Sequence, residues 1–320
     1  MANITDVSRL ANVSKATVSR VLSGSRGVRE ESRLAVLQAA EQLNFRPNAT
    51  ARSLATQATD CVGIILSPQL GNRLASMLPL LEGALARAGK NMLVRFADGA
   101  QQQQQAVDEL LGGRCDGVLV LGTKQPLNPD PRLIQLDGVS DTGNLNLSYD
   151  LTFATESACR FLLGKGHRQL VLMLDDKLSP AGKSAIQGYQ QALQQQSLPY
   201  NSQLVIDGTD NQQALLGLLN RYLPFTALVV QQDAQAADAM RLLREFNLHI
   251  PQDVSVISLE GSALASQLTP PLTCIEYPSE RLAQESVRVL QAQLAQSLRP
   301  ADEQQKFQGR LVVRESVVAR

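Results

Sequence analysis

Tryptophan is absent from this 320-residue sequence, aromatic residues make up only 4% of it, and it contains only two histidines and four cysteines. With His167 and His249 as the only imidazoles, a histidine-rich metal centre is not expected. The cysteines form no C-x-x-C pair and no compact framework, which favours buried free thiols over disulfides. No apolar run is long enough to span a bilayer, and the N-terminus lacks a signal-peptide pattern. These absences predict a cytosolic protein without a metal or cofactor.

Charge is unevenly distributed along the chain. The net charge is zero, but the first sixty residues carry eight basic and five acidic side chains, a net of +3 that leaves −3 for the remainder. The length is about twice that of a usual domain, so two or three domains are expected. A small basic module on a mildly acidic body indicates an anionic partner for the module.

The first residues contain the capping and turn residues that are typical of a helix-turn-helix. Asn3 is placed to cap a short first helix, and Asn12 tolerates the left-handed backbone of a sharp turn. Ser14 then caps a second helix, Lys15–Leu22, and a third helix follows over residues 30–44. The apolar residues expected to face inward from the third helix are Leu34, Leu37, Ala40 and Leu43. In this plan the second helix enters the major groove of DNA.

The outward positions of the second helix suit DNA. Lys15 and Arg20 can donate to guanine edges or phosphates, and Ala16 can contact a thymine methyl group. The remaining residues that we assign to DNA binding in this module are Ser14, Thr17, Ser19, Arg26 and Arg29. The competing interpretation is a small helical cap with a solvated face.

A short segment after the third helix predicts a hinge. Pro47 ends the third helix, and Asn48 can cap a new helix of about two turns, which is marginal in isolation. Leu54 has no evident core to enter and stands near Arg52, so it fits an apolar wedge at a minor-groove step. The alternative is an inert linker. We expect this segment to be ordered only on operator DNA.

These residues carry a family resemblance. The run from Ile4 to Leu22, with Val-Ser-Lys-Ala-Thr-Val-Ser-Arg-Val-Leu at its end, and the run Arg-Pro-Asn-Ala-Thr-Ala-Arg-Ser-Leu at residues 46–54 resemble the LacI/GalR family of bacterial transcription regulators. One departure is Arg29, where the family usually has a capping serine; an arginine there can instead reach a phosphate. The resemblance implies a repressor that binds pseudo-palindromic operator DNA and lies on the bacterial nucleoid when bound.

In the remaining 260 residues, strand-like apolar runs alternate with amphipathic helices, which predicts parallel sheets with helices on both faces. Together with family-like landmarks such as Gly166-His-Arg168, this implies a helix-turn-helix domain followed by a bilobed α/β core of two doubly wound parallel sheets, similar to type I periplasmic binding proteins. The expected domains are residues 1–46 for DNA binding, 47–60 for the hinge and 61–320 for the core. Its lobes are placed at about 61–165 with 278–303, and 166–277 with 304–320.

The resemblance places a small effector between the lobes, most simply a sugar or sugar phosphate that controls a carbohydrate-utilisation operon. Glu260 replaces the usual aspartate, Ala185 replaces the usual arginine, and Arg73 and Leu74 replace an aromatic pair. The residues that we assign to the effector are Arg73, Asp150, Lys183, Gln232, Asp233, Glu260 and Tyr277. Because Lys183 and Arg73 are the available cations, an anionic sugar is slightly favoured over a neutral disaccharide. The alternative is a degenerate cleft and constitutive repression.

An enzyme is not expected. Gly182-Lys-Ser184 follows a strand and opens a helix as in a phosphate-binding P-loop, but Lys177 stands where the motif needs its first glycine. A phosphate-binding enzyme therefore remains only an unlikely alternative, and no dinucleotide fingerprint or nucleophile elbow is present. A C2 homodimer through the core is expected, since a pseudo-palindrome needs two modules and no leucine heptad follows the final strand at residues 311–313.

Overall fold

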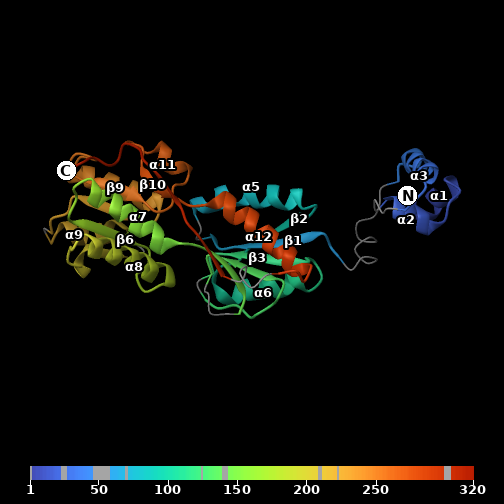
Figure 1. Ribbon diagram of the computed structural model, residues 1–320, viewed down its shortest axis with the longest axis horizontal. Coiled ribbons are helices and arrows are strands. Elements are labelled where there is room, and N and C mark those ends of the chain that lie inside the picture. The colour runs from blue at the N-terminus through green and yellow to red at the C-terminus, as the bar shows by residue number, and fades with distance from the viewer. Residues whose placement is uncertain are drawn as a thin grey trace. The chain divides into compact units, whose positions relative to one another are not determined.

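The computed structural model describes residues 2–22, 27–45, 58–68, 71–123, 125–138, 143–207, 211–221, 223–298 and 304–320. The chain divides into two compact units, Met1–Asp60 and Cys61–Arg320 (Figure 1). Four features predicted from the sequence lie outside the described residues: Arg26 of the DNA-binding domain, and Asn48, Leu54 and the hinge helix that was predicted to contain these two.

The first unit contains three helices: α1 (Ile4–Leu10), α2 (Lys15–Leu22) and α3 (Glu30–Gln42). Asn3 caps α1 in a capping box with Asp6, whose carboxylate accepts from the Asn3 backbone N–H. Asn12 has a φ of 51°, and the Ser8 hydroxyl donates to the Val13 carbonyl at 2.7 Å, which closes the turn between α1 and α2. The predicted helix-turn-helix and its turn residue are confirmed.

The inward face of α3 differs from the one predicted. Val36, Ala39 and Ala40 are buried, whereas Leu34 and Leu37 are 52% and 48% exposed. Residues 36, 39, 40 and 43 follow the i, i+3, i+4, i+7 spacing of one helix face, whereas repeated steps of three drift by about 60° each around the axis. The prediction for Leu34 and Leu37 was therefore wrong.

The second unit contains two lobes, each built on a six-stranded sheet. The N-lobe sheet is parallel, in the order β11 (Gln304–Phe307), β5 (Leu145–Tyr149), β4 (Leu133–Leu136), β3 (Gly117–Leu121), β1 (Cys61–Leu66) and β2 (Asn91–Phe96). Helices α5 (Asn72–Arg87) and α12 (Ser279–Leu294) pack together on one face, and α6 (Gly99–Leu111) covers the other (Figure 1).

The C-lobe sheet has one antiparallel edge strand. Its order is β12 (Arg310–Val312), β10 (Thr273–Glu276), β9 (Ser255–Ser258), β8 (Ala227–Val230), β6 (Leu170–Leu174) and β7 (Val205–Asp207), with β12 antiparallel to β10. One face carries α7 (Leu151–Gly164) and α8 (Pro180–Gln195), and the other carries α9 (Asn211–Leu219) and α10 (Asp233–Glu245). The short helices η2 (Ser202–Leu204) and α11 (Ala263–Gln267) complete the lobe.

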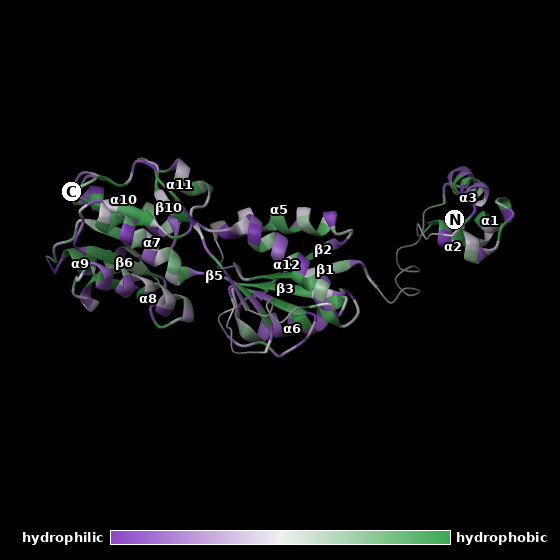
Figure 2. Ribbon diagram, in the orientation of Figure 1, coloured by the Kyte–Doolittle hydropathy of each residue, from purple (hydrophilic) through white to green (hydrophobic). Residues whose placement is uncertain are grey.

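Hydropathy follows this layering. The central strands are apolar on both faces; β3 and β6, for example, are buried at every position. In Figure 2 the strands around β3 are green, whereas α5 and α8 carry purple segments. Strands that are continuously apolar and helices that are half polar are the pattern of a sheet covered on both sides.

The lobe boundaries differ from those predicted. The chain leaves the N-lobe at Asp150, between β5 and α7, because α7 lies in the C-lobe core and the Thr152 hydroxyl donates to the Ser184 carbonyl of α8 at 3.1 Å. The N-lobe segment placed at 61–165 therefore ends one helix earlier. Strand β11 pairs with β5, so residues 304–307 belong to the N-lobe and not to the C-lobe.

The four cysteines and His167 contribute to the folded structure of the second unit. All four cysteines are free; three are buried, and Cys61 is partly exposed. The ring nitrogens of the buried His167 lie 2.9 Å from the Thr226 hydroxyl and 3.0 Å from the Val318 carbonyl. Burial lowers the pKa of His167, so its neutral form joins the C-terminal segment to the sheet.

Candidate functional site

The first unit presents a polar surface on α2. Val18 and Val21 are buried, whereas Lys15, Ala16, Ser19 and Arg20 are exposed. The Ser14 hydroxyl accepts from the Thr17 backbone N–H at 3.1 Å and lies 2.9 Å from the Thr17 hydroxyl. Ser14 therefore caps α2 as predicted, and its hydroxyl is already engaged with Thr17.

Arg29 stands at the N-cap of α3, where its exposed side chain makes no capping hydrogen bond. Its φ and ψ of −60° and 143° are nevertheless those of a cap residue. A serine at this position would have bonded the first turn of α3. The arginine leaves that role empty and places an exposed cation at the start of α3.

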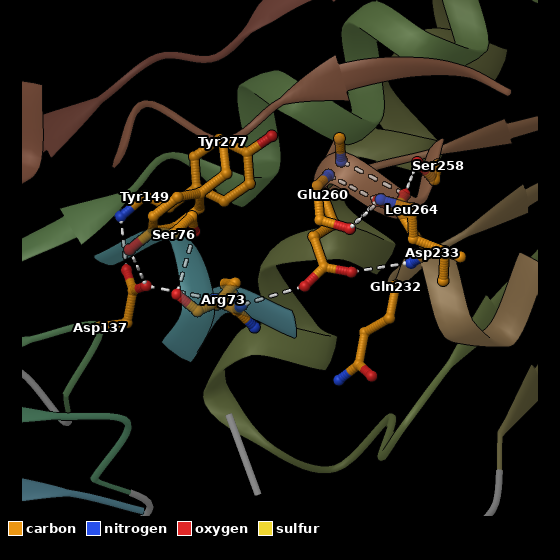
Figure 3. A network of polar contacts seen from close by, with 12 residues as sticks. Arg73, Ser76, Asp137, Tyr149, Gln232, Asp233, Ser258, Glu260, Leu264 and Tyr277 are labelled. Carbon is orange, nitrogen blue, oxygen red and sulfur yellow. Dashed lines mark hydrogen bonds and ion pairs between the residues drawn. The ribbon is translucent and has the colours of Figure 1, made fainter. Parts of the chain in front are cut away.

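Arg73 is the centre of a polar network in the second unit (Figure 3). It lies in the first turn of α5, and its Nη1 is 3.3 Å from Oδ2 of Asp137, which follows β4. Its Nε is 3.8 Å from Oε1 of Glu260, which follows β9 in the other lobe. Burial alone would lower the pKa of Arg73, but Asp137, Tyr277 and Glu260 together raise it above its ordinary value, so the guanidinium stays charged.

Two tyrosines complete the N-lobe side of the network. The Tyr277 hydroxyl donates to Oδ2 of Asp137 at 2.6 Å, and the backbone N–H of Tyr149 donates to Oδ1 at 2.7 Å. The Arg73 guanidinium lies 5.3 Å from the centre of the Tyr277 ring, within cation–π range. Burial raises the pKa of both tyrosines, which therefore act as neutral hydrogen-bond donors.

On the C-lobe side, Glu260 and Asp233 are buried. Oε2 of Glu260 accepts from the Asp233 backbone N–H at 2.8 Å, and burial raises the pKa of Glu260 despite this bond and the nearby Arg73. The Asp233 carboxylate accepts from the Ser258 hydroxyl and from the backbone of Gly261, and it accepts from both the backbone and the hydroxyl of Ser262. Asp233 thus organises the loop after β9 and does not expose its carboxylate to the cleft.

Gln232 is tied to the end of β6. Its Nε2 donates to Asp175 at 2.6 Å, and the Gln235 amide donates to the other Asp175 oxygen at 2.7 Å. Asp175 also contributes to the electrostatic environment of Arg73 and Glu260. The carboxyl ends of β4, β6 and β9 therefore bring three acidic side chains toward the cleft, which is where ligands bind in open α/β sheets.

The structure assembles part of the residue set predicted for the effector. Arg73, Glu260 and Tyr277 lie in one network, with Asp233 and Gln232 behind it. Asp150 instead caps α7 by accepting from the Phe153 N–H at 3.0 Å, and Lys183 is exposed on α8. Among the described residues, neither side chain forms a hydrogen bond or an ion pair with the network.

Sequence reasoning missed Asp137 and Tyr149. Asp137 directly follows the apolar strand Leu133–Leu136, at the carboxyl end where cleft residues are expected, so its position was a usable signal. Tyr149 ends a strand in which polar and apolar residues alternate. Its role depends on the distant Asp137 and Tyr277 and has no local signal.

The space left in this part of the cleft is small. A cavity of about 10 Å³ is lined by Arg73, Asp137, Tyr277 and the apolar side chains of Met77, Leu121 and Leu136. Ligand pockets usually have volumes of roughly 300 Å³ or more, and about 10–15 Å³ is needed for one water molecule. The chain's own side chains therefore fill this part of the cleft.

Comparison with known proteins assigns both units. The model for bacterial regulatory proteins of the lacI family matches residues 3–48, and a periplasmic binding protein-like domain matches residues 159–317. The HTH-type transcriptional regulator GalR of Escherichia coli (strain K12) is 30% identical over 302 residues, which cover 90% of this chain and 88% of GalR. The chain belongs to the lacI family of bacterial regulatory proteins. It is accordingly a DNA-binding transcriptional regulator with a periplasmic binding protein-like domain, and not an enzyme.

Other relatives agree with this assignment. The ribose operon repressor of Escherichia coli (strain K12) is 28% identical over 322 residues, covering 96% of this lacI-family chain and 97% of the repressor. The lac repressor dimer bound to operator and an anti-inducer has a TM-score of 0.84 at 24% identity, covering 99% of both chains. A complex of the regulator CelR with cellobiose has a TM-score of 0.72 at 24% identity, covering 99% of this chain and 100% of CelR. The structural matches confirm the predicted bilobed fold.

Neither a membrane-spanning helix nor a metal-binding cluster is found among the described residues. No helix in the described part of the chain is long and apolar enough to cross a membrane. The same residues contain no group of three or more His, Cys, Asp or Glu side chains that could hold a metal ion.

Proposed function

We propose that this regulator is a repressor of a carbohydrate-utilisation operon, which binds pseudo-palindromic operator DNA as a homodimer in the bacterial cytoplasm and lies on the nucleoid when bound. The observation that carries the DNA-binding part is the exposed face of α2, where Lys15, Ala16, Ser19 and Arg20 form a surface without an acidic side chain. The relatives named for operator binding and for the ribose operon support the regulatory class. Within this surface we assign base reading to Lys15, Ala16 and Arg20.

Arg20→Ala should weaken binding to the cognate operator by about 1–3 kcal/mol, because a bidentate contact to guanine would be lost. The operator is first selected from random duplex DNA with the full chain, and fluorescence anisotropy then measures affinity for it and for random DNA. Arg29→Ala is the matched control, since the loss of a phosphate contact should lower the affinity for operator and for random DNA by the same factor. If Arg20→Ala also lowers both equally, Arg20 contacts only phosphate and base reading lies elsewhere.

We infer that the effector binds in the cleft around Arg73, Asp137, Glu260 and Tyr277. Support comes from the convergence of these side chains at the strand ends of both lobes. A small polyhydroxylated molecule suits carboxylate acceptors, which bind hydroxyl donors. By changing the distance between the lobes, it would alter operator affinity through a coupling of about 1–3 kcal/mol.

A thermal-shift screen of the full chain against sugars, amino sugars, sugar phosphates and nucleosides should find a ligand that raises the melting temperature. Glu260→Gln should remove that shift, because it deletes the charge on the C-lobe side of the network. Lys183→Ala, on the exposed face of α8, is the control and should leave the shift intact. Loss of the shift in Lys183→Ala alone would move the effector site to the start of α8. The competing function, constitutive repression, is favoured if no ligand in any class is found.

A further inference from the structure

The interlobe network has the form of a filled binding site. The Arg73 guanidinium lies between two carboxylates, 3.3 Å from Asp137 and 3.8 Å from Glu260, and 5.3 Å from the centre of the Tyr277 ring (Figure 3). Paired carboxylates beside an aromatic ring form an environment that recognises organic cations. Here the cation is a side chain of the protein itself.

This side chain joins the two lobes. Arg73 belongs to α5 and Asp137 follows β4, both in the N-lobe, whereas Glu260 follows β9 in the C-lobe. The Arg73–Glu260 ion pair is therefore a contact between lobes. Its Glu260 end is fixed, because Oε2 also accepts from the Asp233 backbone N–H. An ion pair at this position does what a bound effector does in a two-lobed protein: it contacts both sides of the cleft.

The charges around Arg73 favour cations over anions. Asp137 and Glu260 flank it directly, and Asp175 contributes from the end of β6. An anionic ligand would have to approach these carboxylates, and Arg73 is already paired with two of them. Lys183, the other cation that the sequence suggested for the cleft, is exposed and makes no contact with the network among the described residues. The preference for an anionic effector drawn from the sequence therefore loses its support.

We propose that Arg73 is an internal occupant of the effector site, and that the small molecule which takes this place carries a protonated amine or guanidinium group. The proposal rests on the function proposed above for the cleft. When Arg73 swings out, the external cation pairs with Asp137 and Glu260 and lies against the Tyr277 ring, while its hydroxyl groups bond the remaining acceptors. Without such a ligand, Arg73 holds the lobes together.

The test is chemical rescue of an Arg73→Ala variant in the full-length chain. Removing the side chain leaves two carboxylates facing each other and an empty volume between them, so the core should melt at a lower temperature than wild type. Millimolar ethylguanidinium or ethylammonium should then restore at least half of the lost melting temperature in a saturable manner, with sodium chloride as the ionic-strength control. Ethyl phosphate and acetate should restore none of it. Wild type should respond less to the cations, because Arg73 competes with them.

A second variant shows where the cation binds. Arg73→Ala combined with Glu260→Gln should lose the rescue, since one of the two carboxylates is gone. Hydrogen exchange of peptides that contain residues 258–264 should show protection by ethylguanidinium in the single variant and not in the double variant. If Arg73→Ala does not fold, refolding it with ethylguanidinium and, separately, with ethyl phosphate serves as the same test, since only the cation should give folded protein.

Two results would overturn the proposal. The first is rescue of Arg73→Ala by ethyl phosphate in preference to the cations, and the second is equal cation binding by wild type and both variants. Neither experiment involves operator DNA or a sugar, so failure here leaves the regulator function untouched. Conversely, if the cation rescues Arg73→Ala but does not change the affinity of the protein for operator DNA, the effector function is rejected and the cation site is kept.

Discussion

Asp233→Ala should destabilise the core by about 3–5 kcal/mol, which is the cost of leaving buried polar partners without their charged acceptor. Asp233 is completely buried. Its carboxylate accepts hydrogen bonds from the Ser258 hydroxyl, from the Gly261 N–H at 3.3 Å and from both donors of Ser262 at 2.5 and 2.7 Å. Alanine leaves all four donors without this acceptor, the Ser258 hydroxyl in a fully buried position and the donors of Gly261 and Ser262 in partly buried ones.

Urea denaturation followed by circular dichroism measures this effect, with Asp150→Ala as the matched control. Asp150 accepts one hydrogen bond at the start of α7 and is partly exposed, so its loss should cost about 1 kcal/mol, the usual value for a helix cap. A loss for Asp233→Ala no larger than for Asp150→Ala would mean that the loop after β9 reorganises to satisfy its donors. Asp233 would then be free for a role in ligand binding.

The DNA-binding unit was predictable because its signals are local. The capping box at Asn3, the left-handed turn at Asn12 and the cap at Ser14 each involve residues within a few positions of one another. The prediction for α3 was wrong because it assigned leucines to the buried face, although the helical spacing of apolar residues that includes Ala39 defines a different face. In so small a core, short side chains at the correct spacing are buried and longer ones at the wrong spacing are not.

The cleft was only partly predictable because its network connects residues that are far apart in the chain. Tyr277 and Asp137 are 140 positions apart, and neither strand end indicates the other. Strand β5 has no continuous apolar run that would mark it in the sequence, because it contains the polar residues Asn146 and Ser148. The Asn146 side chain bonds the Gly138 backbone through both its oxygen and its nitrogen. The assignment of Lys183 to the effector stays a prediction, because a basic residue near a helix start suggests anion binding whether or not the helix points into a cleft.

The lobe boundary shows the same limit. Alternating strands and helices predict a doubly wound sheet, but they do not say to which sheet a helix belongs. Asp150 begins α7 directly after β5, so nothing in the local sequence marks the change of lobe. The assignment follows from packing, and the position that reports it is Gly188, where α8 approaches α7.

Gly188→Ala should destabilise the core by about 3 kcal/mol, although alanine is the better helix former. A Cβ atom built at Gly188 would lie 2.1 Å from the Thr152 carbonyl oxygen and 3.0 Å from the Glu156 nitrogen, both backbone atoms of α7. Backbone atoms cannot rotate away as a side chain can, so the methyl group must separate the two helices. That separation would also stretch the hydrogen bond from Thr152 to Ser184.

Gly217→Ala provides the opposite expectation at a second helical glycine. Gly217 lies within α9, and a Cβ atom there would meet nothing within 4 Å. Alanine should therefore stabilise the core by about 0.5–1 kcal/mol through helix propensity and a less flexible unfolded chain. Chemical denaturation of the two variants should give shifts of opposite sign. If Gly188→Ala is also stabilising, α7 and α8 are not in close contact in solution, and only the packing of α7 on the strands of the C-lobe sheet assigns it to that lobe.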